Sequence, residues 1–267
     1  MTSRHYAVIG SPIAHSLSPV IHKAAYTFLN LDWDYQRHEV KVGELSSFLS
    51  GTASNFSGLS VTMPLKNEAA SLSTPGDEIV KLLGVANTLV NAGDYWQSFN
   101  TDVFGLTKAL DSVWEKTKQV SIIGAGATAQ SALYSVALNA PEATVKVFLR
   151  NLSNGSKIQA LGEQLGLKIE LCELSTLATA QDLTINTIPN QAFEEIISGD
   201  QAGWLLNVNY TEANSAYLEL FGDGKVISGK AMLIWQAIGQ LRAFINDDPA
   251  IELANESELY ESMAAAL

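Results

Sequence analysis

Two hydroxyl side chains stand close together in the stretch 9-IGSPIAHSLSP-19, where an apolar run gives way to polar residues. Ser16 and Ser18 are two residues apart, and Pro19, a residue typical of the first turn of a helix, follows them directly. Two interpretations fit this segment. The serines could cap a helix that starts at Pro19, or their hydroxyl groups could bind a small polar ligand.

Four further segments carry more polar side chains than packing requires. They are 60-SVTMPLK-66, 84-GVANT-88, 100-NTD-102 and 232-MLIWQA-237. In an open α/β sheet, ligands bind beyond the carboxyl ends of the strands. We expect such strand-end loops to hold Ser16, Ser18, Thr62, Lys66 and Asn87. Taken by itself, Lys66 is better explained as a solvated lysine at a helix start, and Asp102 could simply be a helix N-cap.

A glycine turn lies within 119-QVSIIGAGATAQSALYSVALNAPEATVKVFLRN-151, which has the order strand, turn, helix, strand. Gly124 allows the tight turn, Gly126 lets the backbone approach a pyrophosphate, and Ala129 allows the helix to pack closely on the strand. The first turn of the helix would point free N–H groups at the phosphates. The pattern and its length of about 30 residues favour a dinucleotide-binding βαβ unit.

The end of the second strand in this unit, 146-KVFLRNLSNGSK-157, indicates which dinucleotide is bound. NAD-binding versions place Asp or Glu there to hold the ribose 2′-hydroxyl, and this segment has neither. Arg150 could instead pair with a 2′-phosphate through charge-assisted hydrogen bonds, aided by Asn151, Ser153 or Ser156. We therefore predict NADP as the cofactor.

Strand-like runs alternate with amphipathic helical segments along nearly the whole chain, a pattern typical of α/β proteins with largely parallel sheets. The early strands are expected at Tyr6–Gly10, Trp33–Val40, Gly58–Val61 and Thr88–Asn91. Helices are expected between them at Val20–Leu29, Val42–Leu49 and Glu78–Leu83. The nucleotide unit begins near residue 103, so we expect two domains, the second a Rossmann-type doubly wound domain.

The chain has 267 residues, 47% of them apolar, and a net charge of −12 from 16 basic and 28 acidic residues. So acidic a chain lacks the positive surface that nucleic-acid binding requires, and it has no 18-residue apolar run for a membrane span. The single cysteine excludes an internal disulfide. His15 and His22 lack a partner carboxylate cluster, so no metal site is expected. We expect a cytoplasmic protein without a signal peptide.

The segments GSPIAHSLSP, SVTMPLK, GVANT, NTDVFG, GAGATA and SGKAMLIWQA follow one another over nearly the whole chain. In order and spacing they resemble the shikimate dehydrogenase family. The resemblance implies an N-terminal substrate domain, residues 1–102, completed by C-terminal helices, residues 230–267, and an NADP domain, residues 103–229. The implied reaction is the reversible NADPH-dependent reduction of 3-dehydroshikimate to shikimate in aromatic amino-acid (chorismate) biosynthesis, with a small-molecule substrate as the partner.

The resemblance also implies roles for individual residues. Lys66 and Asp102 would be the catalytic pair, in which the ammonium gives a proton to the developing alkoxide and stabilises its charge. The residues implied in substrate binding are Ser16, Ser18 and Tyr210 for the carboxylate and Thr62, Asn87, Asp102 and Gln236 for the ring hydroxyls. The residues implied in cofactor binding are Gly124, Ala125, Gly126, Ala127, Thr128, Arg150, Asn151, Val208, Gly229 and Glu78.

Two other functions stay open at this point. One is a quinate or quinate/shikimate dehydrogenase of the same family. Such members tend to carry Thr at the position of Ser18 and an acid at the strand end, so Ser18 and Arg150 favour shikimate and NADP. The other is a catalytically silent protein that senses shikimate or a nucleotide, which would have no need for Lys66 and Asp102. The oligomeric state is left open as monomer or homodimer.

Overall fold

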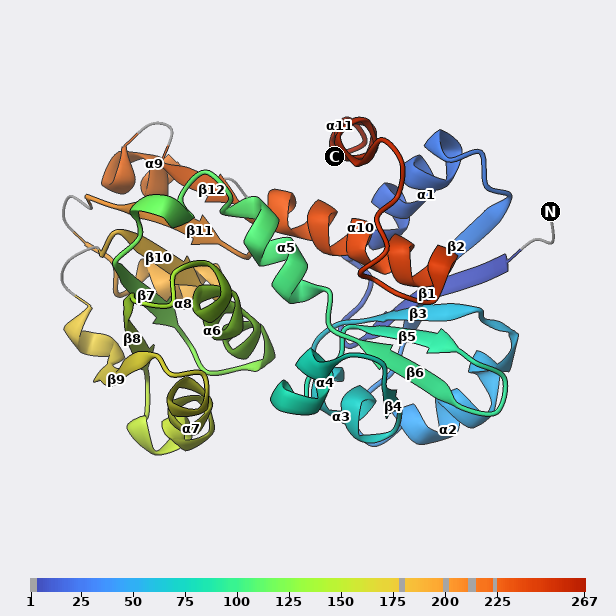
Figure 1. Cartoon of the computed structure of the whole chain (residues 1–267), viewed down its shortest axis with the longest axis horizontal. Helices are drawn as coiled ribbons and strands as arrows, with labels where there is room; N and C mark the ends of the chain where they lie inside the picture. Colours follow the sequence, from blue (N-terminus) through green and yellow to red (C-terminus); the bar gives the residue numbers. More distant parts are fainter. Residues whose placement is uncertain (1–3, 178–180, 199–201, 211–214, 223–224) are drawn as a thin grey trace. The chain divides into compact units, whose positions relative to one another are not determined.

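The computed structural model describes residues 4–177, 181–198, 202–210, 215–222 and 225–267. The chain forms two compact units, each with its own sheet (Figure 1). Unit 1 contains Met1–Gly105 and Ile234–Leu267, and unit 2 contains Leu106–Leu233. From the sequence, the domain boundaries are expected after residues 102 and 229, between a substrate domain and an NADP domain. These boundaries stay a prediction.

Unit 1 is built on a six-stranded sheet in the order β2-β1-β3-β5-β6-β4. The strands are β1 (Arg4–Gly10), β2 (Trp33–Glu39), β3 (Gly58–Val61), β4 (Thr74–Pro75), β5 (Thr88–Asn91) and β6 (Trp96–Phe99). Strand β1 runs parallel to β2 and β3, whereas β5 runs antiparallel to β3 and β6.

The direction of β5 departs from the largely parallel sheets that the sequence predicts. The chain reverses between β5 and β6 in a tight turn at 91-NAGDY-95, where Gly93 adopts φ +90° and Asn91 Oδ1 accepts the Gly93 N–H at 2.9 Å. A short turn can join only antiparallel strands, because a parallel pair needs a long crossover. The α/β class is confirmed, and this hairpin helps to make the sheet of unit 1 mixed.

The helices of unit 1 differ in whether local sequence signals mark their ends. They are α1 (Ser18–Phe28), α2 (Leu45–Ser50), α3 (Lys66–Ser71), α4 (Glu78–Leu83), α11 (Glu256–Ala264), the later part of α10 (Gly229–Asn246) and the 3₁₀ turn η1 (Thr52–Asn55). Helix α4, for example, is capped by Asp77, which accepts the Val80 N–H at 2.7 Å, and ends at Gly84 with φ +61°. Its predicted bounds are confirmed, as are those of β3 and β5.

Helices cover both faces of this sheet, because alternate residues of a strand point to opposite sides. Ala7 and Ile9 of β1 belong to a buried aliphatic core with residues of β3 and β5. Tyr6 points the other way and packs against Phe244 of α10, with ring centroids 4.5 Å apart. Tyr26 of α1 adds a further ring to this second core.

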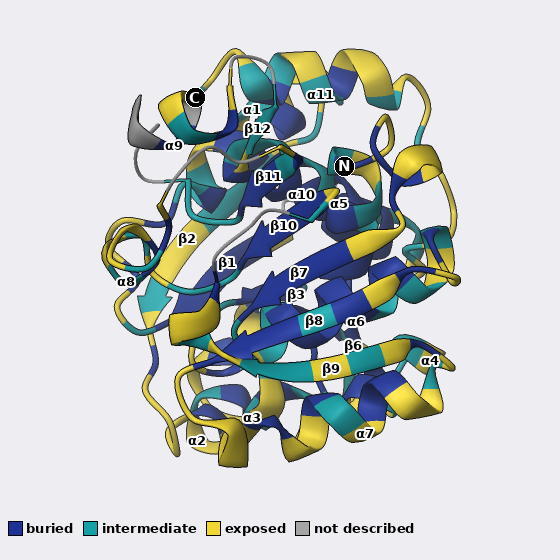
Figure 2. Cartoon of the chain, turned by 90° about the vertical axis from the view of Figure 1, so that its left-hand side faces the viewer, coloured by how far each residue is buried: buried dark blue, intermediate teal, exposed yellow. Residues whose placement is uncertain are grey.

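Unit 2 contains a fully parallel six-stranded sheet in the order β12-β11-β10-β7-β8-β9. The strands are β7 (Gln119–Ile123), β8 (Thr144–Leu149), β9 (Lys168–Glu173), β10 (Leu183–Asn186), β11 (Trp204–Asn207) and β12 (Val226–Ser228). Counted from β9, the chain order is third, second, first, fourth, fifth, sixth, which is the doubly wound order of dinucleotide-binding domains. Central strands β7 and β10 are buried and edge strand β9 is partly exposed (Figure 2).

The helices of unit 2 lie before or between these strands along the chain. They are α6 (Ala127–Asn139), α7 (Ser156–Gln164), α8 (Asn190–Glu194), α9 (Ser215–Phe221), the later part of α5 (Asp102–Ala109), and the 3₁₀ turns η2 (Trp114–Lys116), η3 (Leu152–Gly155) and η4 (Leu174–Thr176). The described helices include none whose length and apolar character would let it cross a bilayer. Within the same residues, His, Cys, Asp and Glu form no group of three suited to a metal ion.

Arg242 of α10 forms ion pairs with two acids, Glu256 at the start of α11 and Glu252 just before it. The two pairs differ in burial, which allows a test of stability. Arg242 Nε and Nη2 donate to the two carboxylate oxygens of Glu256 at 2.7 and 2.6 Å, and its guanidinium lies 4.4 Å from the ring centroid of Phe104. Glu256 is largely buried, whereas Glu252, 3.5 Å from the same Nη2, has a side chain that is 77% exposed.

We predict that Glu256→Gln lowers the free energy of unfolding by about 3 kcal/mol, because it leaves a buried guanidinium without its carboxylate. Glu252→Gln should lower it by less than about 1 kcal/mol, because an exposed ion pair contributes little. Urea unfolding of both variants measures the difference. Equal losses would contradict the assignment of Glu256 as the buried partner.

Candidate active site

The predicted polar residues of unit 1 gather at one edge of its sheet. Strands β1 and β3 end at this edge, so the loops after them, which carry Ser16 and Lys66, begin there. Asn87 precedes β5, but because β5 is antiparallel to β3, its first residue pairs with Ser60 near the end of β3. Strand β6 returns to the same edge, where Phe99 pairs with Thr88, and is followed by Asp102.

Lys66 and Asp102 form an ion pair at this edge through Nζ and Oδ2. Each is the first residue of its helix, Lys66 of α3 and Asp102 of α5. Their side chains are 14% and 4% exposed. Because little water surrounds them, the two charges attract each other more strongly than a surface pair would. The structure thus brings together the two residues predicted as catalytic.

Asn87 connects this pair to α10. Its amide nitrogen lies 2.9 Å from Asp102 Oδ1, 2.9 Å from Thr101 Oγ1 and 3.2 Å from Gln236 Oε1. Its oxygen accepts the Thr101 N–H at 2.8 Å, which fixes which way the amide faces. The Asp102 carboxylate is therefore held by Lys66 on one oxygen and by Asn87 on the other. Lys66, Asn87, Asp102 and Gln236 were predicted from the sequence, whereas Thr101 was missed.

Asn100 caps helix α5 in place of Asp102. Its Oδ1 accepts the N–H groups of Asp102 at 3.1 Å and Val103 at 3.4 Å, and its amide donates to Val85 O. The alternative in which Asp102 serves only as an N-cap is therefore wrong, because a neighbouring side chain performs that task. An asparagine just before a helical segment is itself an N-cap signal, so the sequence contained the information.

Ser16 is buried in the loop that leads into α1, and Ser18 is buried as the first residue of that helix. Leu17 occupies the N-cap position, and Ser16 Oγ accepts the Ser18 N–H at 3.3 Å. A serine hydroxyl therefore bonds an N–H at the start of α1, as the capping interpretation expects, although Ser16 lies one residue before the N-cap position. The ligand-binding role of the two hydroxyls stays a prediction. Arg37 of β2 fixes the loop, since its Nε and Nη2 donate to Ser16 O at 3.1 and 2.7 Å.

Thr62 lies against the loop that follows β1. A Cβ on Gly10 would lie 2.5 Å from Thr62 Cγ2 and 2.7 Å from Met63 O, so only glycine allows these segments to approach. The Ser11 N–H donates to Met63 O at 3.0 Å and holds the two loops together. The loops that carry the serines and Lys66 are thus joined through their backbones.

In unit 2, the glycine turn opens a site at the switch point between β7 and β10. Gly124 adopts φ +106°, and a Cβ there would lie 2.7 Å from Thr187 Oγ1, so glycine is required twice over. Helix α6 begins at Ala127 after an N-cap at Gly126, with no side-chain cap and no acid in its first turn. Its first N–H groups are available to an anion, as at other phosphate sites.

A cavity of about 400 Å³ lies at this turn. It is lined by Gly124, Ala125, Gly126, Phe148, Leu149, Arg150, Asn151, Asn154, Leu174 and Ile188. Arg150 is exposed at the end of β8, and the Asn151 oxygen accepts the Ser153 N–H at 3.0 Å at the start of η3. The helix terminus and a guanidinium thus face one cavity, which fits a dinucleotide with an additional phosphate.

Val208 and Gly229 lie beside each other in unit 2. A Cβ on Gly229 would lie 2.6 Å from the carbonyl oxygens of Asn207 and Val208, so the backbones after β11 and β12 are in contact. The Asn207 side chain accepts from Asn186 Nδ2 at 3.0 Å and donates to Asn190 Oδ1 at 2.9 Å. These hydrogen bonds connect the last residues of β10 and β11 to each other and to the start of α8.

Tyr210 and Glu78 each belong to a different unit from the residues with which they are predicted to share a ligand. Tyr210 belongs to unit 2, where burial raises the pKa of its phenol, whereas Ser16 and Ser18 belong to unit 1. Glu78 belongs to unit 1, where its exposed carboxylate pairs with Lys81 on α4. Their predicted roles, with the substrate carboxylate and the cofactor respectively, stay predictions.

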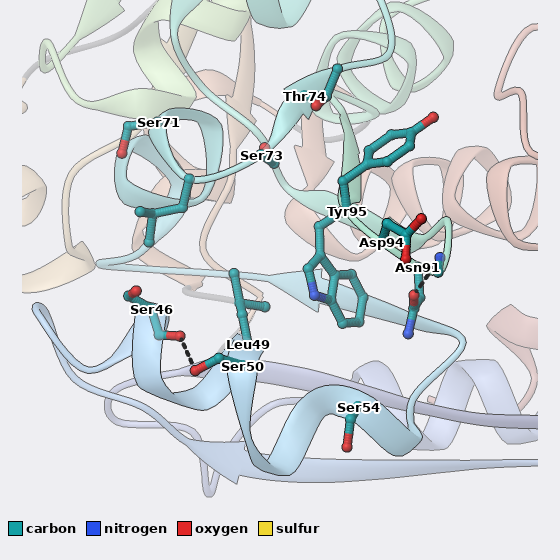
Figure 3. A pocket seen from close by; sticks show the side chains of 13 residues that line it. Ser46, Leu49, Ser50, Ser54, Ser71, Ser73, Thr74, Asn91, Asp94 and Tyr95 are labelled. Carbon is teal, nitrogen blue, oxygen red and sulfur yellow. Dashed lines mark hydrogen bonds between the residues drawn. The ribbon is translucent and has the colours of Figure 1, made fainter.

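Unit 1 has another hollow of about 780 Å³ at the other ends of β5 and β6 (Figure 3). Asn91, Asp94 and Tyr95 of the β5–β6 turn line it, together with several serines. Two of these serines belong to α2, where Ser50 Oγ donates to the backbone oxygen of Ser46 at 3.0 Å. None of the predicted site residues lines this hollow, so it has no part in the site described above.

The chain resembles known proteins over both units. Residues 8–89 match the model of the shikimate dehydrogenase substrate binding domain. The chain is 30% identical to the NADP(+) shikimate dehydrogenase of Ignicoccus hospitalis, over 98% of this chain and 99% of that protein. It is 31% identical to that of Methanothrix thermoacetophila, over 93% and 94%. Mycobacterium tuberculosis shikimate dehydrogenase has a similar structure, with TM-score 0.83, 30% identity and coverage of 98% and 99%.

The buried histidine behind Ser18 predicts a pH-dependent stability. His22 is fully buried, its Nδ1 bonds Ser18 O at 2.9 Å, and burial lowers its pKa to about 4. The unfolded chain, with a histidine pKa of about 6.5, therefore binds more protons than the folded chain between pH 6.5 and pH 4. Stability that is present above pH 6.5 is lost as the pH falls through this window.

We predict that His22 makes the protein lose about 2 kcal/mol of unfolding free energy between pH 7 and pH 5. His22→Leu should lose correspondingly less over the same interval, whatever its stability at pH 7. Urea unfolding at both pH values measures the two differences. The same pH dependence in both proteins would contradict a neutral, buried His22.

Proposed function

The chain belongs to the shikimate dehydrogenase family, and we propose that it catalyses the reversible NADPH-dependent reduction of 3-dehydroshikimate to shikimate. This places it in aromatic amino-acid biosynthesis. The observation that carries the proposal is the Lys66–Asp102 ion pair, held by Asn87 at the strand edge of unit 1. A protein that only binds shikimate would need hydrogen-bonding groups but no proton donor at the reacting oxygen.

Lys66 and Asp102 act on the same ring oxygen in this proposal. NADPH supplies the hydride when it is bound. As the ketone carbon is reduced, negative charge develops on its oxygen, and the Lys66 ammonium lies ready to stabilise that charge and to give it a proton. Asp102 fixes the position of the ammonium and accepts a hydrogen bond from the hydroxyl that forms. In the oxidation direction, Lys66 receives the proton.

The loops around this pair bind the rest of the substrate. The Ser16 and Ser18 hydroxyls hold the carboxylate, with the Tyr210 phenol as a third donor. Thr62, Asn87 and Gln236 bind ring hydroxyls. Supporting this division, the serine loop and the Thr62 loop are hydrogen-bonded to each other, and Gln236 and Asp102 share the Asn87 amide.

The residues of unit 2 fit NADP. The turn from Gly124 to Thr128 binds the diphosphate through N–H groups at the start of α6, and Arg150 with Asn151 binds the 2′-phosphate. Val208 and Gly229 flank the nicotinamide, where the missing side chain of Gly229 leaves the backbone accessible. Glu78 is proposed as a further cofactor contact. We also propose a cytoplasmic location, a monomeric or homodimeric state and no binding of nucleic acid.

The function is tested by following absorbance at the reduced-nicotinamide band. Purified protein is supplied with shikimate or quinate, and with NADP⁺ or NAD⁺. We expect kcat/KM to be highest for shikimate with NADP⁺. A higher value for quinate with NAD⁺, or no reduction with any pair, would overturn the proposal.

We predict that Lys66→Met lowers kcat by roughly 10²–10⁴-fold, the usual contribution of a positioned acid or base. The effect should be on kcat more than on KM, because the ammonium matters most when charge develops on the oxygen. Lys23→Met, which removes an exposed lysine from α1, is the control and should behave as the wild type. Near-normal turnover of Lys66→Met at saturating shikimate would refute the role of Lys66.

We predict that Arg150→Gln raises the KM for NADPH by about 10–100-fold, the value of a charge-assisted hydrogen bond of about 1.5–3 kcal/mol. The KM for NADH should change by less than twofold, because NADH has no 2′-phosphate. Steady-state kinetics with both nucleotides on the same preparation provide the internal control. Equal increases for NADPH and NADH would remove Arg150 from the 2′-phosphate site.

A further inference from the structure

A line of polar side chains crosses the otherwise aromatic second core of unit 1. The Tyr35 phenol of β2 donates to Ser60 Oγ of β3 at 2.5 Å, and Ser60 Oγ donates to Gln240 Oε1 of α10 at 2.7 Å. Ser60 and Gln240 are 3% and 2% exposed. Each donor has an acceptor, so the line has a single direction. A complete buried network of this kind fixes one arrangement of its members.

One end of this line lies beneath the serine loop. His22 of α1 stacks on the Tyr35 ring, with centroids 4.1 Å apart and planes inclined by 20°. The same histidine bonds Ser18 O through Nδ1 at 2.9 Å. Burial raises the pKa of the Tyr35 phenol, so the phenol stays a neutral hydrogen-bond donor. His22 therefore links the Tyr35 ring to the backbone of Ser18.

The other end reaches the residues that hold the ion pair. Gln240 Nε2 donates to the backbone carbonyl of Asn87 at 3.0 Å. That carbonyl also accepts the Val61 N–H at 2.7 Å, and Asn87 carries Asp102 on its side-chain amide. A shift of Gln240 would therefore be transmitted to Asn87 and to the carboxylate of Asp102.

We propose that Tyr35, Ser60 and Gln240 are positioning residues that set the spacing between the Ser16–Ser18 loop and the Lys66–Asp102 pair. The proposal rests on the proposed function, in which these two groups hold the carboxylate and the reacting oxygen of one substrate. Both groups of the substrate are attached to a rigid six-membered ring, so the protein must match a fixed separation. A misplacement of about 1 Å can cost about 10²-fold in rate.

The test uses variants that break the line with little change in shape. We expect Tyr35→Phe and Gln240→Leu each to lower kcat/KM for shikimate by about tenfold. Tyr26→Phe is the matched control, because it removes another phenolic hydroxyl from the same core, one that has no hydrogen-bond partner in the structure. It should leave kcat/KM within twofold of the wild type. Should Tyr35→Phe fail to fold, Ser60→Ala breaks the same link.

A second substrate distinguishes positioning from a general loss of structure. The methyl ester of shikimate lacks the carboxylate charge, so the serine loop cannot hold it as firmly and the spacing matters less. We expect Tyr35→Phe and Gln240→Leu to lower kcat/KM for the ester by less than twofold. The double variant should lose no more than either single variant on shikimate, because both break one line.

Equal losses on shikimate and its ester, or losses that multiply in the double variant, would overturn the proposal, as would a Tyr35→Phe enzyme that behaves like Tyr26→Phe. These outcomes are read against an active wild-type enzyme. If the wild type itself does not oxidise shikimate with NADP⁺, the proposed function fails, and the positioning role fails with it.

Discussion

The ion pair between Lys66 and Asp102 is the interaction around which the site of unit 1 is arranged. The two residues are 36 positions apart and begin different helices, so no local rule brings them together. The sheet does so, because the antiparallel strand β5 and its hairpin partner β6 return the chain to the edge where β3 ends. Two asparagines then fix the position of Asp102. The Asn87 amide donates to the carboxylate oxygen Oδ1, and Asn100 Oδ1 accepts the backbone N–H of Asp102 at the start of α5.

The candidate residues of both units lie at the ends of strands. In unit 1 they are the polar side chains around Lys66 and Asp102, and in unit 2 they belong to the glycine turn after β7. The chain is an NADP-dependent oxidoreductase of the shikimate dehydrogenase family. In unit 2 the fully parallel sheet has a switch point between β7 and β10, and the glycine turn opens there. In unit 1 the mixed sheet brings four loops to one edge, which suits a small ligand with several hydroxyl groups. The difference in strand direction thus matches a difference in ligand.

Sequence patterns predicted the elements with strong local signals. Strands β3 and β5 are apolar runs bounded by polar residues, and α4 is bounded by Asp77 and Gly84, so their limits were predicted correctly. Strands β6 and β9 were missed. Strand β9 is a half-exposed edge strand, and β6 carries two polar residues, Gln97 and Ser98, at its centre. The turn Asn91-Ala92-Gly93-Asp94 is a hairpin signal that would have revealed β6.

The contacts of the site could be predicted less well than its members. Lys66, Asn87, Asp102 and Gln236 stood out as candidate site residues. Gln240, in contrast, lies in an apolar helical segment without a motif, and Ser60 belongs to SVTMPLK but carries no feature that sets it apart. The bond from Asn87 to Gln236 joins residues 149 positions apart, and such a contact depends on the packing of α10 on the sheet. Arg37 was missed for the same reason, since only the fold brings β2 beside the serine loop.

A crystal structure with shikimate bound would show whether Lys66 and Asp102 act on one oxygen of the substrate. We predict that Lys66 Nζ and the Asp102 carboxylate both lie within about 3.2 Å of the same ring hydroxyl, with the substrate carboxylate on the Ser16 and Ser18 hydroxyls. A bound substrate whose reacting hydroxyl contacts neither residue, or whose carboxylate faces Lys66 instead, would contradict it.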